Sequence, residues 1–250
     1  MGKVTGAVKR EWSWLFTGQR SVLLVAAMVV GIDAILGLLH IVAMVGWDAP
    51  NVLRVDMDGS YAEAYQYVKY FWVVILLTLF AVARRSWSLA AWIPLFVYFL
   101  ADDALLVHEL AGYAFSLQPW SFGVGPVSAQ TIGELGVSAI ALLVLGLPIV
   151  LAYARADAKT RMIHLSLVVL VVVMLVFAVV IDFAHSFFID IRILDRAMGF
   201  VEDFGEMLVL SAIVVYLMRV NLEATRLASA RTATVDAVMP GQLRRRIAQV

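Results

Sequence analysis

The chain has 250 residues, of which 63% are hydrophobic and only 15% are charged. A soluble domain carries roughly a quarter charged residues, so this composition is typical of a membrane protein. Because 19 basic residues balance 19 acidic ones, no net charge favours nucleic acid as a partner, and the absence of cysteine excludes disulfides, thiolate metal cages and thiol catalysis.

The chain divides into three segments. Residues 1–20 form a charged leader with Trp12 and Trp14, expected in the cytoplasm or at the membrane interface; residues 21–219 are the membrane domain; residues 220–250 are a polar cytoplasmic tail. Within the membrane domain, six apolar stretches have about the 17–25 residues needed to cross a bilayer. They are 21–46, 64–83, 88–116, 129–154, 163–189 and 198–219. The sequence therefore predicts an all-α bundle of six transmembrane helices.

The loop before the second span contains two local motifs. In "SYAE" (60–63), the side chains of Ser60 and Glu63 can satisfy free backbone amides, which predicts a capping box at the start of a helix. The overlapping "DMDGS" (56–60) has the composition of a calcium loop, but a loop of the EF-hand type needs a glutamate where Tyr67 stands. We therefore expect a helix cap here and no calcium loop of that type.

Basic residues are concentrated on one side of the predicted membrane domain. They precede the first span, separate the second from the third and the fourth from the fifth, and follow the sixth. They include Arg20, Arg84, Arg85, Arg155, Lys159, Arg161, Arg219 and Arg226. The alternate connections are acidic, uncharged or of mixed charge. By the positive-inside rule we expect a multi-pass protein of a bacterial inner membrane with both termini in the cytoplasm.

Acidic residues and histidines recur at one depth of the predicted spans, in the half nearer the outside. This polar layer comprises Asp33 and His40 in the first span, Asp102, Asp103, His108 and Glu109 in the third, Glu134 in the fourth, Asp182 and His185 in the fifth, and Glu202, Asp203 and Glu206 in the sixth. Each charge inside a span costs on the order of 3 kcal/mol on insertion scales, and Lys69 is the only cation expected within reach. Carboxylates without cationic partners must be protonated, hydrated or bound to metal, which indicates a functional site facing the periplasm. His164, at the opposite end of the fifth span, is expected to be an ordinary packing residue.

Helical spacing selects the residues that can share a metal ion. At about 100° per residue, Asp102 and Glu109 lie on one face, and Asp182 and His185 are adjacent, whereas His108 points to a different side. The predicted metal ligands are Asp102, His108, Glu109, Glu134, Asp182, His185, Asp203 and Glu206, with Asp33, His40, Asp103 and Glu202 as supporting polar residues. Carboxylate and imidazole groups from several helices are ligands for zinc, iron or manganese, so a divalent metal is the expected cofactor.

Three functions fit this polar layer. The first is a metal-binding membrane protein, with metal-dependent hydrolysis or oxidation of a lipid-like substrate as its activity. The second is a proton- or cation-coupled transporter; such proteins usually have broken helices near their site, whereas Pro94 and Pro148 lie away from the layer. The third is a subunit of a membrane complex without catalysis. Membrane lipids are the expected surroundings in all three cases, and no nucleic acid partner is expected.

Overall fold

The computed structural model describes residues 20–45, 50–84, 87–124, 127–185, 187–188 and 190–238. These residues form helices, turns and loops and contain no β-strand. The predicted interfacial leader, apart from Arg20, and the last residues of the predicted tail lie outside the described residues.

Eight helices of four or more residues make up the described chain, together with three short turns. The helices are α2 (Arg20–Val45), α3 (Tyr61–Arg84), α4 (Ile93–Leu105), α5 (Val107–Ser116), α6 (Ala129–Arg155), α7 (Ala158–Leu175), α8 (Asp182–His185) and α9 (Arg192–Val238), and the turns are η1 (Asn51–Leu53), η2 (Leu89–Trp92) and the π-helical η3 (Val176–Ile181). Five stretches are long and apolar enough to cross a membrane, or six if the bent pair formed by η2–α4 and α5 counts as one span. The predicted all-α class is confirmed for the described residues, and their five to six long apolar helices are compatible with the six spans predicted from the sequence.

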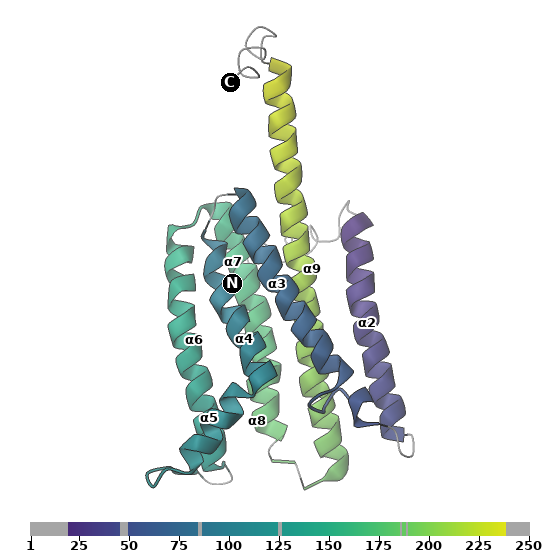
Figure 1. Ribbon diagram of the computed structural model, residues 1–250, viewed down its shortest axis with the longest axis vertical. Coiled ribbons are helices and arrows are strands. Elements are labelled where there is room, and N and C mark those ends of the chain that lie inside the picture. Colours follow the sequence, from purple (N-terminus) through teal and green to yellow (C-terminus); the bar gives the residue numbers. More distant parts are fainter. Residues whose placement is uncertain are drawn as a thin grey trace, which may run out of the picture.

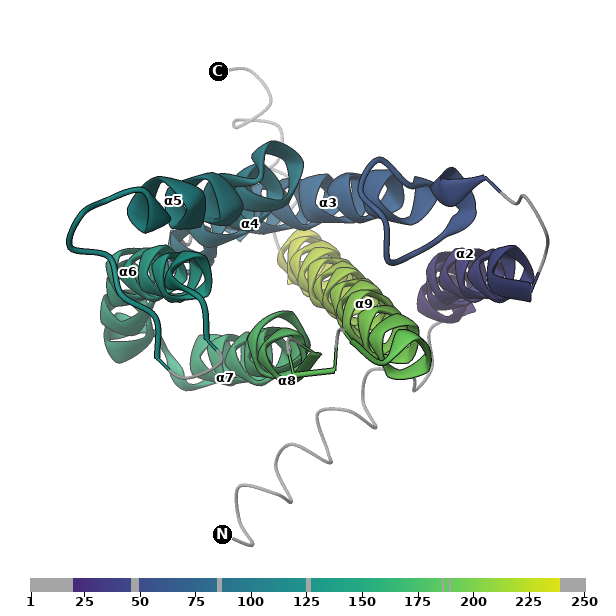
Figure 2. The same ribbon diagram turned by 90° about the horizontal axis from the view of Figure 1, so that it is seen from below.

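The helices form a ring with one helix outside it. Helices α3, α4, α6, α7 and α9 each contact the next, and the last contacts the first; α2 lies outside the ring against α9 and α3 (Figure 2). The long helices α2, α3, α4, α6, α7 and α9 alternate in direction along the chain, so the neighbours α3 and α9, which close the ring, run in the same direction; α9 extends beyond the others at its C-terminal end (Figure 1). We call the opposite end of the bundle, formed by residues 50–60, α5, α8 and the first turns of α9, the lower end after its position in Figure 1. The ends of α2 and α5 and the starts of α3, α6 and α9 gather there.

The ring is filled by apolar side chains, and its outer surface is apolar as well. Trp92, Phe96, Leu167 and Leu217 are buried in one continuous core cluster. Large apolar residues also cover the outer faces of the helices, including Leu24, Met28, Leu143 and Leu147, which are all more than half exposed. A soluble monomer rarely exposes such continuous apolar surface, so these faces have the character expected of helices that contact lipid.

His164 fixes α7 to its neighbours at the end of the bundle opposite the lower end. It is fully buried, and its Nδ1 accepts a hydrogen bond of 2.9 Å from the indole N–H of Trp92. The proton must then be on Nε2, which lies 2.9 Å from the hydroxyl oxygen of Ser88 and can donate to it. This is the packing role that the sequence predicts for His164.

Asp157 caps the start of α7 at the same end of the bundle. Its carboxylate accepts hydrogen bonds from the backbone N–H groups of Thr160 and Lys159 at 3.0 and 2.9 Å, and from the Thr160 hydroxyl at 2.9 Å. These bonds, above all the one from the Thr160 backbone, hold the pKa of Asp157 below its usual value. The connection between α6 and α7 is therefore tight and well defined.

Candidate functional site

The third apolar stretch is broken within the predicted polar layer. Helices α4 and α5 meet at an angle of 65°, and the residue between them, Leu106, has a left-handed backbone with φ 53° and ψ 42°. Such a conformation in a residue other than glycine costs on the order of 1–3 kcal/mol and is most often found at functional sites. The sequence contains no proline or glycine at this point, so the break was not predicted.

Asp102 stabilises the break. Its Oδ1 accepts the backbone N–H of His108 at 2.9 Å, which caps the first turn of α5, and its Oδ2 lies 3.1 Å from His108 Nδ1. On a straight helix these two side chains would point to different sides, as the sequence predicts. That prediction is wrong, because the bend turns His108 back towards Asp102.

A second backbone irregularity lies across the bundle from the first. The π-helical turn η3 joins α7 to α8, and Asp182 follows it directly. In this turn Phe177 packs directly on Gly205 of α9, where an added Cβ would lie only 2.2 Å from the Phe177 ring. Turns of this type are rare and frequently occur at functional sites.

The capping box predicted before α3 is confirmed. The backbone N–H of Glu63 donates to the hydroxyl of Ser60 at 3.2 Å, and the Glu63 carboxylate accepts the N–H of Gly59. Gly59 has a positive φ of 70°, which only glycine adopts without strain. This local order fixes residues 56–60 over the lower end of the bundle.

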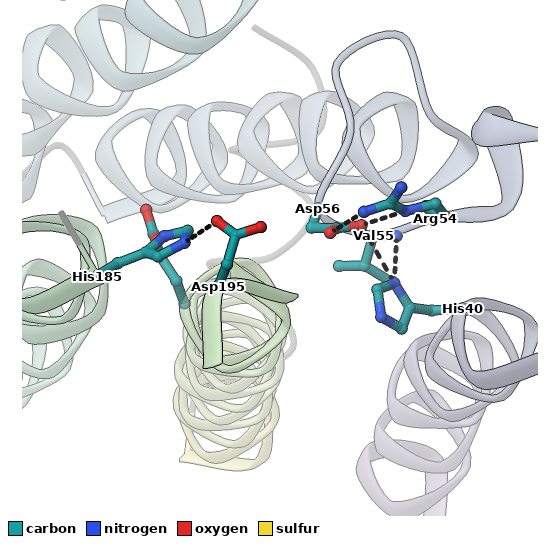
Figure 3. A network of polar contacts seen from close by, with 7 residues as sticks. His40, Arg54, Val55, Asp56, His185 and Asp195 are labelled. Carbon is teal, nitrogen blue, oxygen red and sulfur yellow. Dashed lines mark hydrogen bonds and ion pairs between the residues drawn. The ribbon is translucent and has the colours of Figure 1, made fainter. Parts of the chain in front are cut away.

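His40 ties the same loop to α2 and α9. Its Nδ1 accepts the backbone N–H of Val55 at 3.0 Å, and its ring packs on Phe200 with centroids 4.6 Å apart. Beside it, Arg54 Nε donates to Asp56 Oδ1 at 2.9 Å (Figure 3). His40 therefore anchors a loop.

A cavity of about 440 Å³ lies inside the ring at the lower end. The carboxylates that line it are Asp56 and Asp58 from the loop, Glu63 from α3, Asp102 and Asp103 from α4, Glu109 from α5, Glu134 from α6, Asp182 from α8, and Glu202, Asp203 and Glu206 from α9. His108 is the only histidine among the lining residues, and none of them is Lys or Arg. We call this cavity the acidic chamber. Because Asp58 and Asp182 are exposed, the chamber reaches the surface of the protein.

The acidic chamber gathers most of the predicted metal ligands. Seven of the eight line it, namely Asp102, His108, Glu109, Glu134, Asp182, Asp203 and Glu206, and so do the supporting residues Asp103 and Glu202. The chamber brings them together without packing them into a cage: in the part of the chain that the structure describes, no group of three or more His, Asp or Glu side chains is placed to hold a metal ion. Metal binding therefore stays a prediction.

The eighth predicted ligand, His185, lies beside the chamber and bridges α8 to α9. Its Nε2 is 3.1 Å from Asp195 Oδ1 (Figure 3). Its Nδ1 is 3.3 Å from Glu202 Oε2. Both ring nitrogens are thus engaged by carboxylates of α9. While this bridge persists, neither nitrogen has a free lone pair for a metal.

Asp33 belongs to a separate buried ion pair, which corrects its predicted place in the site. The ammonium of Lys69 lies 3.1 Å from Asp33 Oδ1 and also donates to the Met207 carbonyl at 2.7 Å and the Ser211 hydroxyl at 3.1 Å. Both charged side chains are 0% exposed. The pair joins α2, α3 and α9 in the fold, and neither Asp33 nor His40 lines the chamber.

Some chamber residues were missed from the sequence. Glu63, Gln66 and Tyr70 all line the chamber from α3, and their spacing of three and four residues places them on one helical face. That spacing was visible in the sequence, but polar side chains on a single helix do not reveal what they face. Asp56 and Asp58 were considered only for a calcium loop of their own.

The chamber carboxylates act on one another across several helices. Glu206 of α9 interacts electrostatically with Asp203, Asp103, Glu202 and Asp182, and Asp182 in turn interacts with Glu134 of α6. Like charges 4 Å apart repel by about 4 kcal/mol at the effective dielectric near a protein surface, and less at larger distances. Protonation of some of these carboxylates or entry of a cation would relieve this repulsion.

Comparison with known proteins places the chain in a family. No curated protein and no solved structure matches it. Residues 22–220 match the model of a family described as a domain of unknown function, DUF8692. The matched range runs from α2 to the middle of α9 and includes all the residues that line the chamber. The chain belongs to the DUF8692 family.

Proposed function

We propose that the protein is an integral membrane protein that binds a cation in the acidic chamber and uses this binding for cation-coupled transport. The observation that supports it most is the lining of the chamber: among the described residues, eleven carboxylates from seven segments and no Lys or Arg line one cavity of about 440 Å³. In the described part of the chain, only some of these carboxylates are paired with a basic side chain, such as Asp56 with Arg54 and Asp102 with His108. Carboxylates inside a membrane are expensive and are retained where they bind ions or protons.

The same proposal includes a membrane orientation. Arg155, Lys159 and Arg161 lie at the connection between α6 and α7, at the end of the bundle opposite the chamber. By the positive-inside rule this end faces the cytoplasm, together with both termini, and the chamber opens towards the periplasm of a bacterial inner membrane.

Reporter fusions test this orientation. Alkaline phosphatase inserted at Asp58 is expected to be active, because that loop is exported, whereas the same enzyme fused to the C-terminus is expected to be inactive. A fluorescent protein that folds only in the cytoplasm should give the reverse pattern. Equal activity at both positions would contradict the arrangement of the six spans.

Transport is favoured by the two backbone irregularities at the chamber. The break at Leu106 and the π turn η3 both contribute residues to its lining, and interrupted helices are a recurring feature of secondary transporters at their ion sites. A metal-dependent hydrolase or oxidase using zinc, iron or manganese is the second candidate. It is favoured by the seven predicted ligands in one cavity, but it requires three of them to converge on one point.

Ion uptake into vesicles tests the proposal. Purified protein in liposomes is expected to carry radioactive ²²Na⁺ or ⁴⁵Ca²⁺ across the membrane, and Glu206→Gln is expected to slow uptake by about tenfold because it removes a chamber carboxylate that can bind a cation or a proton. Asp157→Asn, at the far end of the bundle, is the matched control and should leave uptake unchanged. If the wild type moves neither ion, and protein purified without chelator contains stoichiometric zinc, iron or manganese, the enzyme takes the place of the transporter.

A further inference from the structure

Two buried oxygen atoms in the wall of the acidic chamber have no hydrogen-bond partner. Gln66 is only 7% exposed and lines the chamber from α3, yet its Oε1 accepts no hydrogen bond. Asp103 lines the chamber from α4, and its Oδ2 is likewise buried and unpartnered. Buried acceptors are nearly always satisfied in folded proteins, so two of them in one cavity wall point to an occupant that donates hydrogen bonds or carries positive charge. The carboxylates that line the same cavity favour a positively charged occupant.

We propose that Gln66 and Asp103 are ligands of a deep subsite in the acidic chamber that takes a hard cation bound through oxygen, with Ca²⁺ as the best match among divalent ions. This inference rests on the proposed function and specifies its ligand. The sequence predicts zinc, iron or manganese bound by carboxylates and imidazoles. In the proposed subsite the ligands are instead carboxamide and carboxylate oxygens, without imidazole nitrogen.

The available donor atoms select this class of cation. The chamber wall offers carboxylates, the amide of Gln66, and the hydroxyls of Tyr70 and Tyr98. The two unpartnered atoms that define the subsite, Gln66 Oε1 and Asp103 Oδ2, are both oxygens. Oxygen ligands without imidazole or thiolate suit Ca²⁺ and Mg²⁺, whereas zinc and iron prefer nitrogen or sulfur.

The size of the chamber favours a partly hydrated ion. At about 30 Å³ of liquid volume per water molecule, a cavity of about 440 Å³ holds on the order of a dozen waters. Ca²⁺ accepts six to eight oxygen ligands in flexible geometry, so a few side chains and several waters complete its shell. This explains how an ion can bind where no three carboxylates converge.

The two proposed ligands are held in place by a contact between their helices. The hydroxyl of Tyr67, one residue after Gln66, donates to Glu63 and lies 3.4 Å from the backbone carbonyl of Asp103. This contact joins α3 to α4 at the turn that carries Asp103. Rigid placement of both oxygens reduces the ordering needed when an ion binds.

Terbium luminescence tests the subsite directly. Tb³⁺ is a hard ion that replaces Ca²⁺ and becomes luminescent when a nearby tyrosine, here Tyr70 or Tyr98, is excited. We expect purified protein in nanodiscs of neutral lipid to bind Tb³⁺, and Ca²⁺ to displace it at lower concentration than Zn²⁺. Gln66→Met, which keeps the size of the side chain but removes the oxygen, should weaken Tb³⁺ binding by about tenfold, and Asp103→Asn by at least as much.

The control is a second glutamine in the same chamber. Gln130 lines the wall formed by α6, and its amide nitrogen donates to Glu134 at 2.8 Å, so Gln130→Met should change the Tb³⁺ affinity less than threefold. Displacement by Zn²⁺ before Ca²⁺ overturns the inference, and so does equal loss of affinity in the Gln66 and Gln130 variants. If Gln66→Met and Asp103→Asn both bind Tb³⁺ as tightly as the wild type, the cation binds elsewhere in the chamber. That result overturns the subsite and leaves the proposed function standing. Absence of any Tb³⁺ binding by wild-type protein overturns the subsite, while the uptake of ²²Na⁺ decides the proposed function.

Discussion

Replacing Lys69 with methionine is expected to lower the free energy of unfolding by about 3–5 kcal/mol. The ammonium of Lys69 is fully buried and bonds to Asp33, to the Met207 carbonyl and to the Ser211 hydroxyl. Its removal leaves the Asp33 carboxylate buried with only the Ser211 hydroxyl as a donor, and an uncompensated buried charge is far more costly than a missing surface ion pair. Reversible unfolding in mixed micelles measures the change.

Two further variants separate charge from packing. The double variant Asp33→Asn, Lys69→Met removes both charges and is expected to recover most of the stability lost by Lys69→Met alone. Lys159→Met is the matched control, because Lys159 is largely exposed and its distance to Glu223 is 3.6 Å; it should cost less than about 1 kcal/mol. If Lys69→Met is as stable as the wild type, the pair does not hold α2, α3 and α9 together.

Features determined by local sequence were predicted well. The long apolar stretches became α2, α3, α6, the α7–α8 pair and α9, because the length of an apolar run is set by the bilayer and is visible in one dimension. The capping box at Ser60 and Glu63 was also predicted, since both of its bonds join residues within four positions of each other.

Features determined by contacts between helices were not predicted. The break at Leu106 depends on Asp102 capping α5, and nothing in the residue types around Leu106 demands it. The pairing of Asp33 with Lys69 depends on how α2 and α3 are rotated against α9. Depth along a span, which the sequence does give, cannot distinguish a residue that faces a chamber from one that faces a buried partner.

The composition of the candidate site was predicted in part for the same reason. Equal depth brought carboxylates of α4, α6, α8 and α9 into one cavity, as their common position in the spans implied. Gln66 was missed because its amide carries no charge, so its presence within an apolar helix does not by itself indicate a functional site. His185 was expected in the cavity, but the turn that follows α8 brings it against Asp195 and Glu202 instead.

Equilibrium binding of radioactive ⁴⁵Ca²⁺ and, separately, ⁶⁵Zn²⁺ to purified protein in neutral nanodiscs tests the central claim that the acidic chamber binds a cation. We predict saturable binding of at least one of these ions by the wild type. The double variant Asp203→Asn, Glu206→Gln should weaken it by about a hundredfold, since it removes two chamber carboxylates that can bind a cation, with little change in shape. Folding is checked by the elution volume and the melting temperature of the same samples. Absence of saturable binding by the folded wild type, or equal binding by the folded double variant, would contradict the claim.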